Sequence, residues 1–282
     1  MPPDRVLVRL SSLGDVVLVG AITAAFPGDT GVLTLPRYAD LIARARGVSA
    51  VYVPGDVLPD VPIVDLHNSP ASRRLTLGRN VRGVERQDLR RRLHVAFKTR
   101  PGDLVVDRYA LAAGVAVAPA PWFPAAERGG TLIIAPGAAH ATKRWPYWRA
   151  LAKAWPGPVR ALGGPGDEAA IADIGGVCED GWVRTLEAMN GACALVGGDT
   201  GLLHLAAAVG LPVVGIFGPT TSADGFWCHA GEAVELPLPC RPCSRFGGAV
   251  CAVGDHACMR GIDVARVIAA IERVTAPRSG AA

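Results

Sequence analysis

The residues best suited to chemistry follow a short apolar run near the N-terminus. Val6–Leu10 is typical of a buried strand, and Ser11, Ser12, Gly14 and Asp15 come directly after it. Gly14 would let the backbone approach a ligand closely, and Asp15 would stand in the first turn of a helix, at the sheet edge where α/β proteins form their sites. An acidic residue there also has a purely structural explanation, because it complements the helix dipole. The G-x-G-x-x-G fingerprint is absent, which argues against an NAD enzyme.

A second polar group begins where a later apolar run ends in Gly197 and Gly198. Asp199 and Thr200 follow at the predicted start of a helix, where free backbone N–H groups and the helix dipole favour an anion such as a diphosphate. His204 comes four residues after Thr200 and therefore lies on the same helix face. A histidine on a helix rich in Ala and Leu is commonly a packed residue, but its alignment with this turn favours contact with a ligand.

A third group combines glycine with cations. Gly137 and Thr142 lie in a loop that reaches Lys143 and Arg144 just before a predicted helix start near Pro146. A cation in this position is able to neutralise the charge on a departing phosphate in place of a metal ion. Lys143 fits a solvated surface position equally well.

These groups need elements that hold them at the edge of a sheet. Short runs rich in Val, Ile and Leu alternate with stretches of helical period, which is typical of βαβ units and parallel sheets. The predicted strands are Val6–Leu10, Val32–Leu35, Ala50–Val53, Ile63–Leu66, Leu104–Val106, Thr131–Ala135, Val159–Leu162, Ala194–Val196 and Val213–Phe217. The predicted helices are Asp15–Ala25, Arg37–Arg46, Tyr147–Ala154, Asp167–Ile174, Leu202–Val209 and Ile262–Val274.

The two series of elements are separated by residues 118–130, whose prolines and glycines suit a linker. We therefore predict an α/β protein of two Rossmann-like domains, residues 1–124 and 125–282, with parallel sheets facing a cleft. The 282 residues are 50% hydrophobic, enough for two proper cores. No apolar run approaches the roughly 20 residues that span a bilayer, and no secretory signal is visible, so we expect a cytoplasmic protein.

Basic residues are concentrated in the first half of the chain. Residues 1–124 hold 16 Lys and Arg against 11 Asp and Glu, whereas the remainder holds 13 against 14. Within residues 73–98, nine basic side chains face only Glu85 and Asp88, and such a field attracts phosphates. A solvated helix face explains any single arginine equally well. The segment lacks interleaved aromatic residues, so we expect no nucleic-acid partner and favour an anionic glycolipid or the surface of the inner membrane.

Four of the seven cysteines, Cys240, Cys243, Cys251 and Cys258, fall within residues 240–258. Four thiolates at this spacing are able to surround one tetrahedral ion, and both zinc and iron accept such ligands. Two disulfides, or four reduced thiols in a loop, are the alternatives, and a reducing compartment disfavours disulfides. We predict a structural zinc or iron at this loop.

Taken together, the motifs Arg9–Asp15, Lys143–Pro146, Asp199–His204 and Phe217–Thr220 resemble glycosyltransferase family 9, the ADP-heptose:lipopolysaccharide heptosyltransferases. The resemblance extends from Val6 to about Ile262. It implies the GT-B fold, in which the first domain binds the acceptor and the second binds the nucleotide sugar. It also supports the metal at the four cysteines, since a branch that modifies proteins binds iron in this way.

Residue roles follow from the same resemblance. Asp15 matches the proposed catalytic base of an inverting transfer, and Lys143 matches the lysine on the donor phosphates. The other donor-binding positions are Ser12, Gly14, Thr142, Asp167, Asp199, Thr200, Gly201 and His204, with Asp167 on the adenosine ribose. Arg9 and Ser11 are expected on the acceptor side, and the chemistry needs no catalytic metal.

The expected reaction moves a heptose from ADP-heptose to a hydroxyl of the lipopolysaccharide core or a related glycan. The first domain, at about 120 residues, is short for the family, which leaves the acceptor open. The alternatives are a heptosyltransferase that modifies protein and a non-catalytic subunit that binds a sugar nucleotide or serves in assembly.

Overall fold

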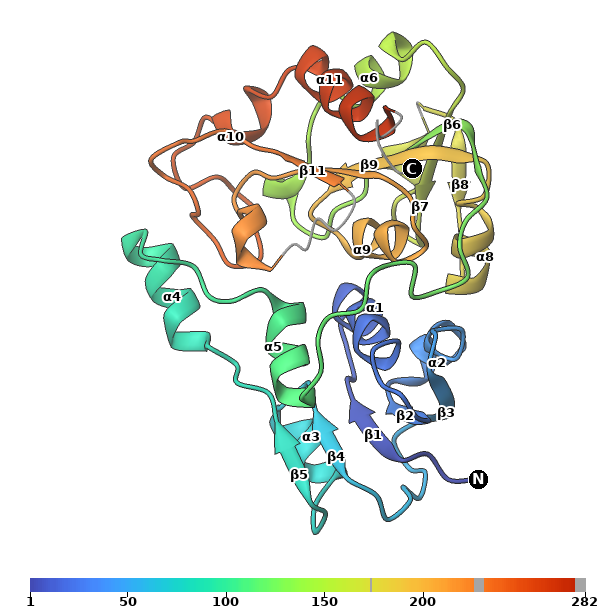
Figure 1. The fold of residues 1–282 in the computed structure, drawn as a ribbon. Helices are drawn as coiled ribbons and strands as arrows, with labels where there is room; N and C mark the ends of the chain where they lie inside the picture. The colour runs from blue at the N-terminus through green and yellow to red at the C-terminus, as the bar shows by residue number, and fades with distance from the viewer. Residues whose placement is uncertain (173, 226–230, 277–282) are drawn as a thin grey trace.

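In the computed structural model, which describes residues 1–172, 174–225 and 231–276, the chain forms two parallel β-sheets, each with its own helices (Figure 1). The predicted α/β class with two Rossmann-like domains is therefore confirmed. The chain passes from one sheet to the other between residues 113 and 128, a stretch that contains the predicted boundary.

The first sheet has five parallel strands in the order β3-β2-β1-β4-β5. They are β1 (Arg5–Val8), β2 (Thr30–Leu33), β3 (Val48–Tyr52), β4 (Ile63–Asp65) and β5 (Val81–Gly83). The helices of this domain are α1 (Leu13–Thr23), α2 (Pro36–Ile42), α3 (Pro70–Leu75), α4 (Asp88–Phe97) and α5 (Val105–Ala113). Val6, Leu7 and Val8 of the central strand are completely buried, as expected for a strand covered on both faces. The polar residues after Val8 therefore emerge at the carboxyl edge of the sheet.

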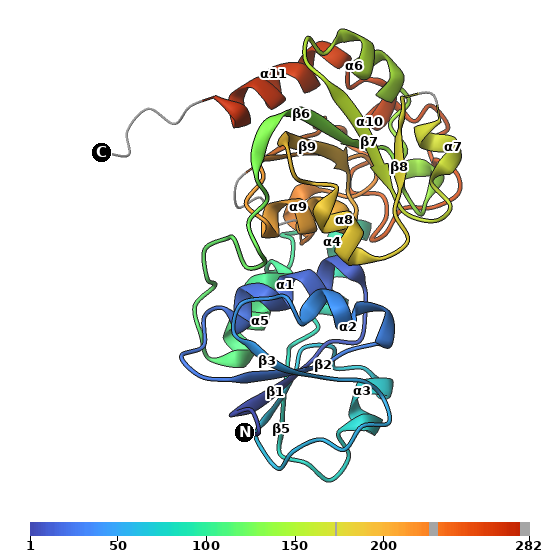
Figure 2. The ribbon, with the colours of Figure 1, turned by 90° about the vertical axis from the view of Figure 1, so that its right-hand side faces the viewer.

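The second sheet has six parallel strands in the order β11-β10-β9-β6-β7-β8. They are β6 (Arg128–Ala135), β7 (Val159–Gly163), β8 (Gly176–Cys178), β9 (Ala192–Gly198), β10 (Val213–Ile216) and β11 (Gly231–Val234). Its helices are α6 (Trp148–Ala154), α7 (Glu168–Ile171), α8 (Trp182–Glu187), α9 (Gly201–Ala208), α10 (Ala257–Arg260) and α11 (Val264–Thr275), with short 3₁₀ turns η1 (Ala141–Lys143) and η2 (Ser222–Asp224). Helices α6 and α11 cover the outer face, and α9 lies on the face toward the first domain (Figure 2).

Helices α1 and α9 pack against each other and join the two domains (Figures 1 and 2). A Cβ atom on Gly14 would lie 2.7 Å from His204 Cδ2, and one on Gly201 would lie 2.6 Å from Leu13 Cδ2. Each glycine therefore allows the start of one helix to approach the other. At Gly14 we predicted the close approach of a ligand; in the structure the neighbouring group is the imidazole of His204, and ligand contact at Gly14 stays a prediction.

The predicted strand Leu104–Val106 is wrong, because Val105 and Val106 begin α5, whose buried side packs on α1. A short apolar run cannot be assigned to strand or helix by periodicity alone.

The predicted linker contains no helix or strand until β6 begins at Arg128. It packs against the domains, since Trp122 and Phe123 are each only 1% exposed and the backbone N–H of Trp122 donates to the Ala208 carbonyl.

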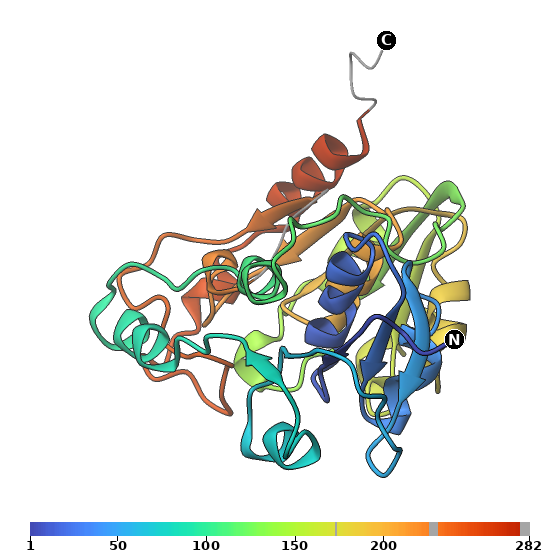
Figure 3. The same cartoon turned by 60° about the horizontal axis from the view of Figure 1, so that its bottom comes forward.

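Helix α4 stands at the outer edge of the molecule, away from both sheets (Figures 1 and 3). None of the helices within the described ranges is both long and apolar enough to span a membrane.

Candidate active site

A cavity between the domains brings together residues from both of them. The first domain contributes Ser12, Gly14, Asp15, Leu18, Arg91 and Val105. The second contributes Lys143, Asp199, Thr200, Gly201, His204, Thr220, Thr221, Gly225, Arg245 and Phe246. The carboxyl edges of the two sheets thus face the same space, which is where open α/β sheets bind ligands.

Asp15 lies in the first turn of α1 with its carboxylate held by three side chains. Oδ2 forms an ion pair with Arg9 at 2.6 Å and accepts a hydrogen bond from the Ser12 hydroxyl at 2.8 Å. Oδ1 accepts a hydrogen bond from the Tyr109 hydroxyl at 3.3 Å. Burial alone would raise the pKa of Asp15, but the Arg9 charge and the Ser12 hydrogen bonds outweigh burial and lower that pKa below its ordinary value. Asp15 is therefore ionised at neutral pH.

Tyr109 is a site residue that the sequence did not reveal. It lies on α5, 94 positions from Asp15, and only 1% of it is exposed. Burial, together with the Asp15 charge, raises the pKa of the Tyr109 phenol well above its ordinary value. The hydroxyl consequently keeps its proton and serves as a donor to the carboxylate.

Lys143 and Asp199 form an ion pair on the opposite side of the cavity. The Lys143 ammonium lies 2.6 Å from Asp199 Oδ2 and donates to the Asp199 carbonyl at 3.1 Å. The Thr220 hydroxyl donates to the same carboxylate oxygen at 2.9 Å. Asp199 thereby fixes the position of the ammonium beside the start of α9, and the Lys143 side chain is only 13% exposed.

Helix α9 begins at this ion pair with donors directed at the cavity. Thr200 is its N-cap residue, and the side chain makes no capping hydrogen bond. Its Oγ1 is buried and has no hydrogen-bond partner among the described residues. His204 lies one turn further on, and burial, the largest influence, lowers the pKa of its imidazole, so it is neutral at pH 7. A ligand with acceptor oxygens would satisfy Thr200 and the free N–H groups of the helix start.

A second cavity opens on the other side of Thr200 and Gly201. Its lining includes Asp167, Gly137 and Trp182. The Asp167 carboxylate accepts a hydrogen bond from the Gly164 N–H at 3.1 Å. A Cβ on Gly137 would come within 2.4 Å of that carboxylate, so glycine is required where the loop after β6 passes it. The shared residues Thr200 and Gly201 connect this cavity to the one that contains Asp15.

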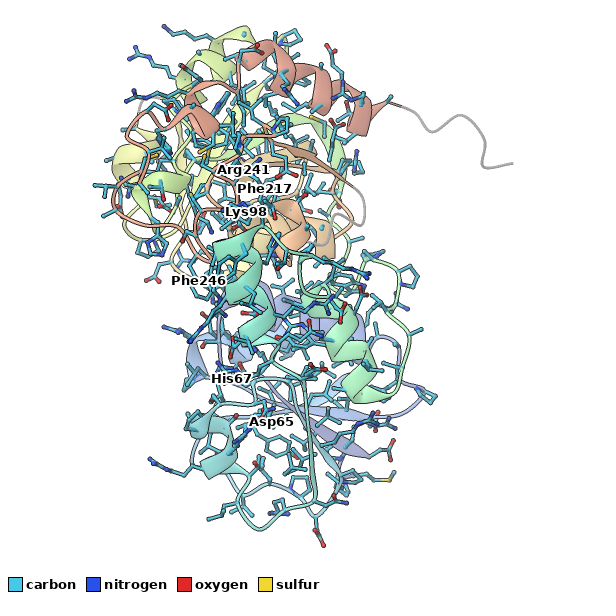
Figure 4. The ribbon with its side chains drawn as sticks, turned by 90° about the vertical axis from the view of Figure 1, so that its left-hand side faces the viewer. Asp65, His67, Lys98, Phe217, Arg241 and Phe246 are labelled. Atoms are coloured by element: carbon cyan, nitrogen blue, oxygen red, sulfur yellow. The ribbon has the colours of Figure 1, made fainter. Side chains whose placement is uncertain are left out.

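A third cavity continues from Asp15 into the first domain and is strongly basic. Its lining includes the guanidinium groups of Arg9, Arg86, Arg91, Arg108 and Arg245, against the carboxylates of Asp15 and Asp88. His67 and Phe246, which also line it, lie on either side of the space beside α4 (Figure 4).

Several donors at the third cavity are unsatisfied. The Nε–H groups of Arg9, Arg108 and Arg245 are buried without a hydrogen-bond partner in the described part of the chain, and the same holds for His67 Nδ1. Such groups are costly to leave unpaired, so the cavity suits an anion. Arg245 belongs to the second domain and crosses the cleft to form a 2.7 Å ion pair with Asp88.

Most of the predicted site residues are brought together, with two exceptions. Thr142 lines neither donor cavity, because its hydroxyl is buried and exchanges hydrogen bonds with the backbone of Gly248 at 3.0 and 2.8 Å. It anchors the cysteine-rich loop. Ser11 does not line the cavities around Asp15, whereas Arg9 lines the third. Arg91 was signalled only by the basic excess of residues 73–98, and no sequence feature signalled Arg245.

The predicted metal site at Cys240, Cys243, Cys251 and Cys258 is not confirmed. Nowhere in residues 1–172, 174–225 and 231–276 do three or more His, Cys, Asp or Glu side chains form a group able to hold a metal ion. Cys243 is exposed and Cys258 is buried in the first turn of α10, and burial raises the pKa of the Cys258 thiol to about 11. Because no three of these side chains are placed as ligands of one ion in the described residues, the structural zinc or iron stays a prediction.

The family model for glycosyltransferase family 9 (heptosyltransferase) matches residues 184–246, which include the start of α9 and the loop after β10. The resemblance to glycosyltransferase family 9 is confirmed. The lipopolysaccharide heptosyltransferase 1 of Pseudomonas aeruginosa is 30% identical over 128 residues, 40% of this chain and 36% of that relative. The lipooligosaccharide heptosyltransferase 2 of Campylobacter jejuni is 28% identical over 104 residues, 36% of this chain and 32% of the relative. These matches span only about a third of the relatives' lengths.

Solved structures of family 9 proteins share the fold over nearly the whole chain. The family 9 glycosyltransferase of Veillonella parvula has a TM-score of 0.72 at 16% identity and covers 96% of both chains. The E. coli ADP-heptose lipopolysaccharide heptosyltransferase II has a TM-score of 0.66 at 19% identity and covers 98% of both chains. TibC, a dodecameric iron-containing heptosyltransferase of enterotoxigenic E. coli solved with ADP-heptose, has a TM-score of 0.65 at 14% identity, covering 97% of this chain and 77% of TibC. At these identities the likeness establishes the GT-B fold alone.

Proposed function

We propose that the protein is an inverting glycosyltransferase that moves a heptose from ADP-heptose to a hydroxyl of the lipopolysaccharide core or a related glycan. One observation carries the proposal: Asp15 of the first domain and Lys143, Thr200 and Gly201 of the second line one cavity. A direct displacement at a sugar carbon requires a base for the attacking hydroxyl and, facing it, a site that stabilises the leaving phosphate. Asp15 and the start of α9 have this arrangement.

The donor would extend across the two connected cavities of the second domain. The adenosine would occupy the cavity of Asp167, with the carboxylate toward the ribose hydroxyls. The diphosphate would lie over Thr200 and Gly201, where the orphan hydroxyl, the free N–H groups and the Lys143 ammonium converge. The heptose would then point toward Asp15.

In the transfer step, the acceptor hydroxyl attacks the anomeric carbon as Asp15 takes its proton. The bond to the diphosphate breaks on the opposite side, and this geometry inverts the configuration. Lys143 and the start of α9 stabilise the negative charge that develops on the leaving ADP. These groups supply the charge stabilisation that a divalent ion provides in other transferases, so we expect transfer to persist in a chelator.

An acceptor with anionic groups suits the third cavity. Five guanidinium groups converge there around two carboxylates. An acceptor anion that draws Arg9 away from Asp15 would remove the interaction that lowers its pKa. Acceptor binding would thus make Asp15 a stronger base in the complex that reacts.

The second candidate is a heptosyltransferase that modifies protein, the alternative that the family resemblance leaves open. The arginines of the third cavity, three of which have a buried Nε without a partner in the described residues, favour an anionic glycan over a neutral peptide side chain. A non-catalytic binding subunit would have no need for an ionised carboxylate held by three donors opposite the donor site.

The direct test is thermal unfolding of the purified protein with a panel of nucleotide sugars, followed by ADP release from the stabilising donor. We expect ADP-heptose to raise the unfolding temperature more than UDP- or GDP-sugars, because stabilisation follows affinity. ADP release should then depend on added lipopolysaccharide core and be insensitive to EDTA. Donor binding without turnover on any acceptor would indicate the binding subunit instead, and release only with a protein acceptor would indicate the second candidate.

A further inference from the structure

Helix α4 presents its apolar side chains outward. Leu89, Leu93 and Phe97 are 71%, 40% and 72% exposed. Their spacing of four residues places them on one face of the helix. The opposite side carries Arg91, which lines the two cavities that contain Asp15, and the buried His94. This distribution is the reverse of an ordinary surface helix, whose apolar stripe faces the core.

The stripe lies within the most basic part of the chain. Residues 82–100 contain seven basic side chains and only two acidic ones. Arg92 is exposed on the same helix, and Arg100 is exposed just beyond its end. Lysine and arginine beside an exposed Leu and Phe stripe are the composition of helices that lie in the interface of an anionic membrane.

The positive charge of this face also favours an anionic membrane over a second copy of the chain as the binding partner. In a twofold dimer whose axis passes through this face, α4 would meet the α4 of its partner, and two surfaces of the same strong positive charge would repel each other. An anionic bilayer supplies the opposite charge and an apolar layer for Leu89 and Phe97 at once.

We propose that α4 docks the protein on a membrane surface rich in anionic headgroups, with Leu89, Leu93 and Phe97 inserted between the headgroups. Because Arg91 of the same helix lines the cavity of Asp15, docking would hold the mouth of the acceptor cavity at the membrane surface. The proposal goes beyond the transfer reaction and does not depend on the identity of the donor.

The test is cosedimentation of the full chain with vesicles of phosphatidylcholine, with or without 30% phosphatidylglycerol. We expect binding to the anionic vesicles only, and weaker binding at 0.5 M salt. Leu89→Ser combined with Phe97→Ser should lower the partition constant at least roughly tenfold, because two exposed apolar side chains are lost. Leu111→Ser is the matched control, since Leu111 is 71% exposed on α5 outside the basic segment, and it should bind like the wild type.

A second variant separates charge from apolar insertion. Arg92→Gln combined with Arg100→Gln should weaken binding to anionic vesicles and leave the unfolding temperature unchanged. The proposal would be overturned if the wild type bound neutral and anionic vesicles equally well. It would also be overturned if the Leu89→Ser, Phe97→Ser variant bound anionic vesicles as strongly as the wild type. The proposal also fails if sedimentation velocity shows a wild-type oligomer that the stripe variant loses, because the stripe would then join copies of the chain. Donor-induced thermal stabilisation, measured without vesicles, reports on the transfer proposal separately.

Discussion

The two sides of the cleft, for which we propose donor and acceptor binding, are built from different groups. Around Thr200 and Gly201, on the proposed donor side, these groups are backbone amides, glycines and a hydroxyl at the start of one helix. The proposed acceptor side consists largely of arginine side chains, which come from the segment after β1, the segment before α4, helices α4 and α5, and a loop of the other domain. A backbone site is fixed by the fold, whereas a site of arginines can be changed one side chain at a time.

The largest effect is expected where the two sides meet. Asp15→Asn keeps the size and the Tyr109 contact but removes the base, so transfer should fall by about a thousandfold, within the range of general-base catalysis. Donor affinity should change little. Asp107→Asn, an exposed carboxylate on α5, is the control. Initial rates of ADP release and calorimetric titration of the donor measure the two quantities, and a variant that transfers normally would remove Asp15 from the mechanism.

Lys143→Met tests the donor side. Loss of the ammonium beside the helix start should slow transfer by roughly a hundredfold or more, as removal of one charge-stabilising donor does in other enzymes. Donor affinity should fall as well, because the ground-state diphosphate also meets this cation. Lys153→Met, on the exposed side of α6, should leave both unchanged. Equal values for Lys143→Met and wild type would place the diphosphate elsewhere.

Arg9→Gln tests the acceptor side through its effect on Asp15. Burial raises the pKa of Asp15 and the Arg9 charge lowers it, so removal of the guanidinium should raise this pKa. The acid limb of the kcat/KM profile should therefore move to higher pH, whereas Lys143→Met should leave that limb in place. An acid limb at the wild-type position would show that Arg9 does not control the carboxylate. The measurement is the pH dependence of kcat/KM for the acceptor.

The smallest effect concerns the joint between the domains. Gly14→Ala places a Cβ 2.7 Å from His204 Cδ2, and overpacking of this kind costs about 1–3 kcal/mol of stability. The free energy of unfolding in urea should fall accordingly. Gly130→Ala is the control, because a Cβ there has no neighbour within 4 Å. A Gly14→Ala protein as stable as the control would mean that α1 and α9 do not approach this closely.

The same contrast explains what sequence could predict. Asp199, Thr200 and Gly201 follow a buried strand directly, so local chemistry marks them as an anion site. Tyr109 contacts Asp15 across a sequence separation of 94 residues, and Arg245 contacts Asp88 across 157 residues. No local sequence pattern predicts contacts at such separations. The unpredicted strands β5, β8 and β11 are short edge strands without an apolar run.

A crystal structure of the protein with ADP-heptose, or with a 2-fluoro analogue that resists transfer, tests the account most directly. The diphosphate should contact the Thr200 hydroxyl, the Gly201 N–H and Lys143, with the ribose toward Asp167 and the anomeric carbon facing Asp15. A diphosphate bound away from α9, or a sugar whose anomeric carbon faces away from Asp15, would contradict the proposal that the two domains act on one donor.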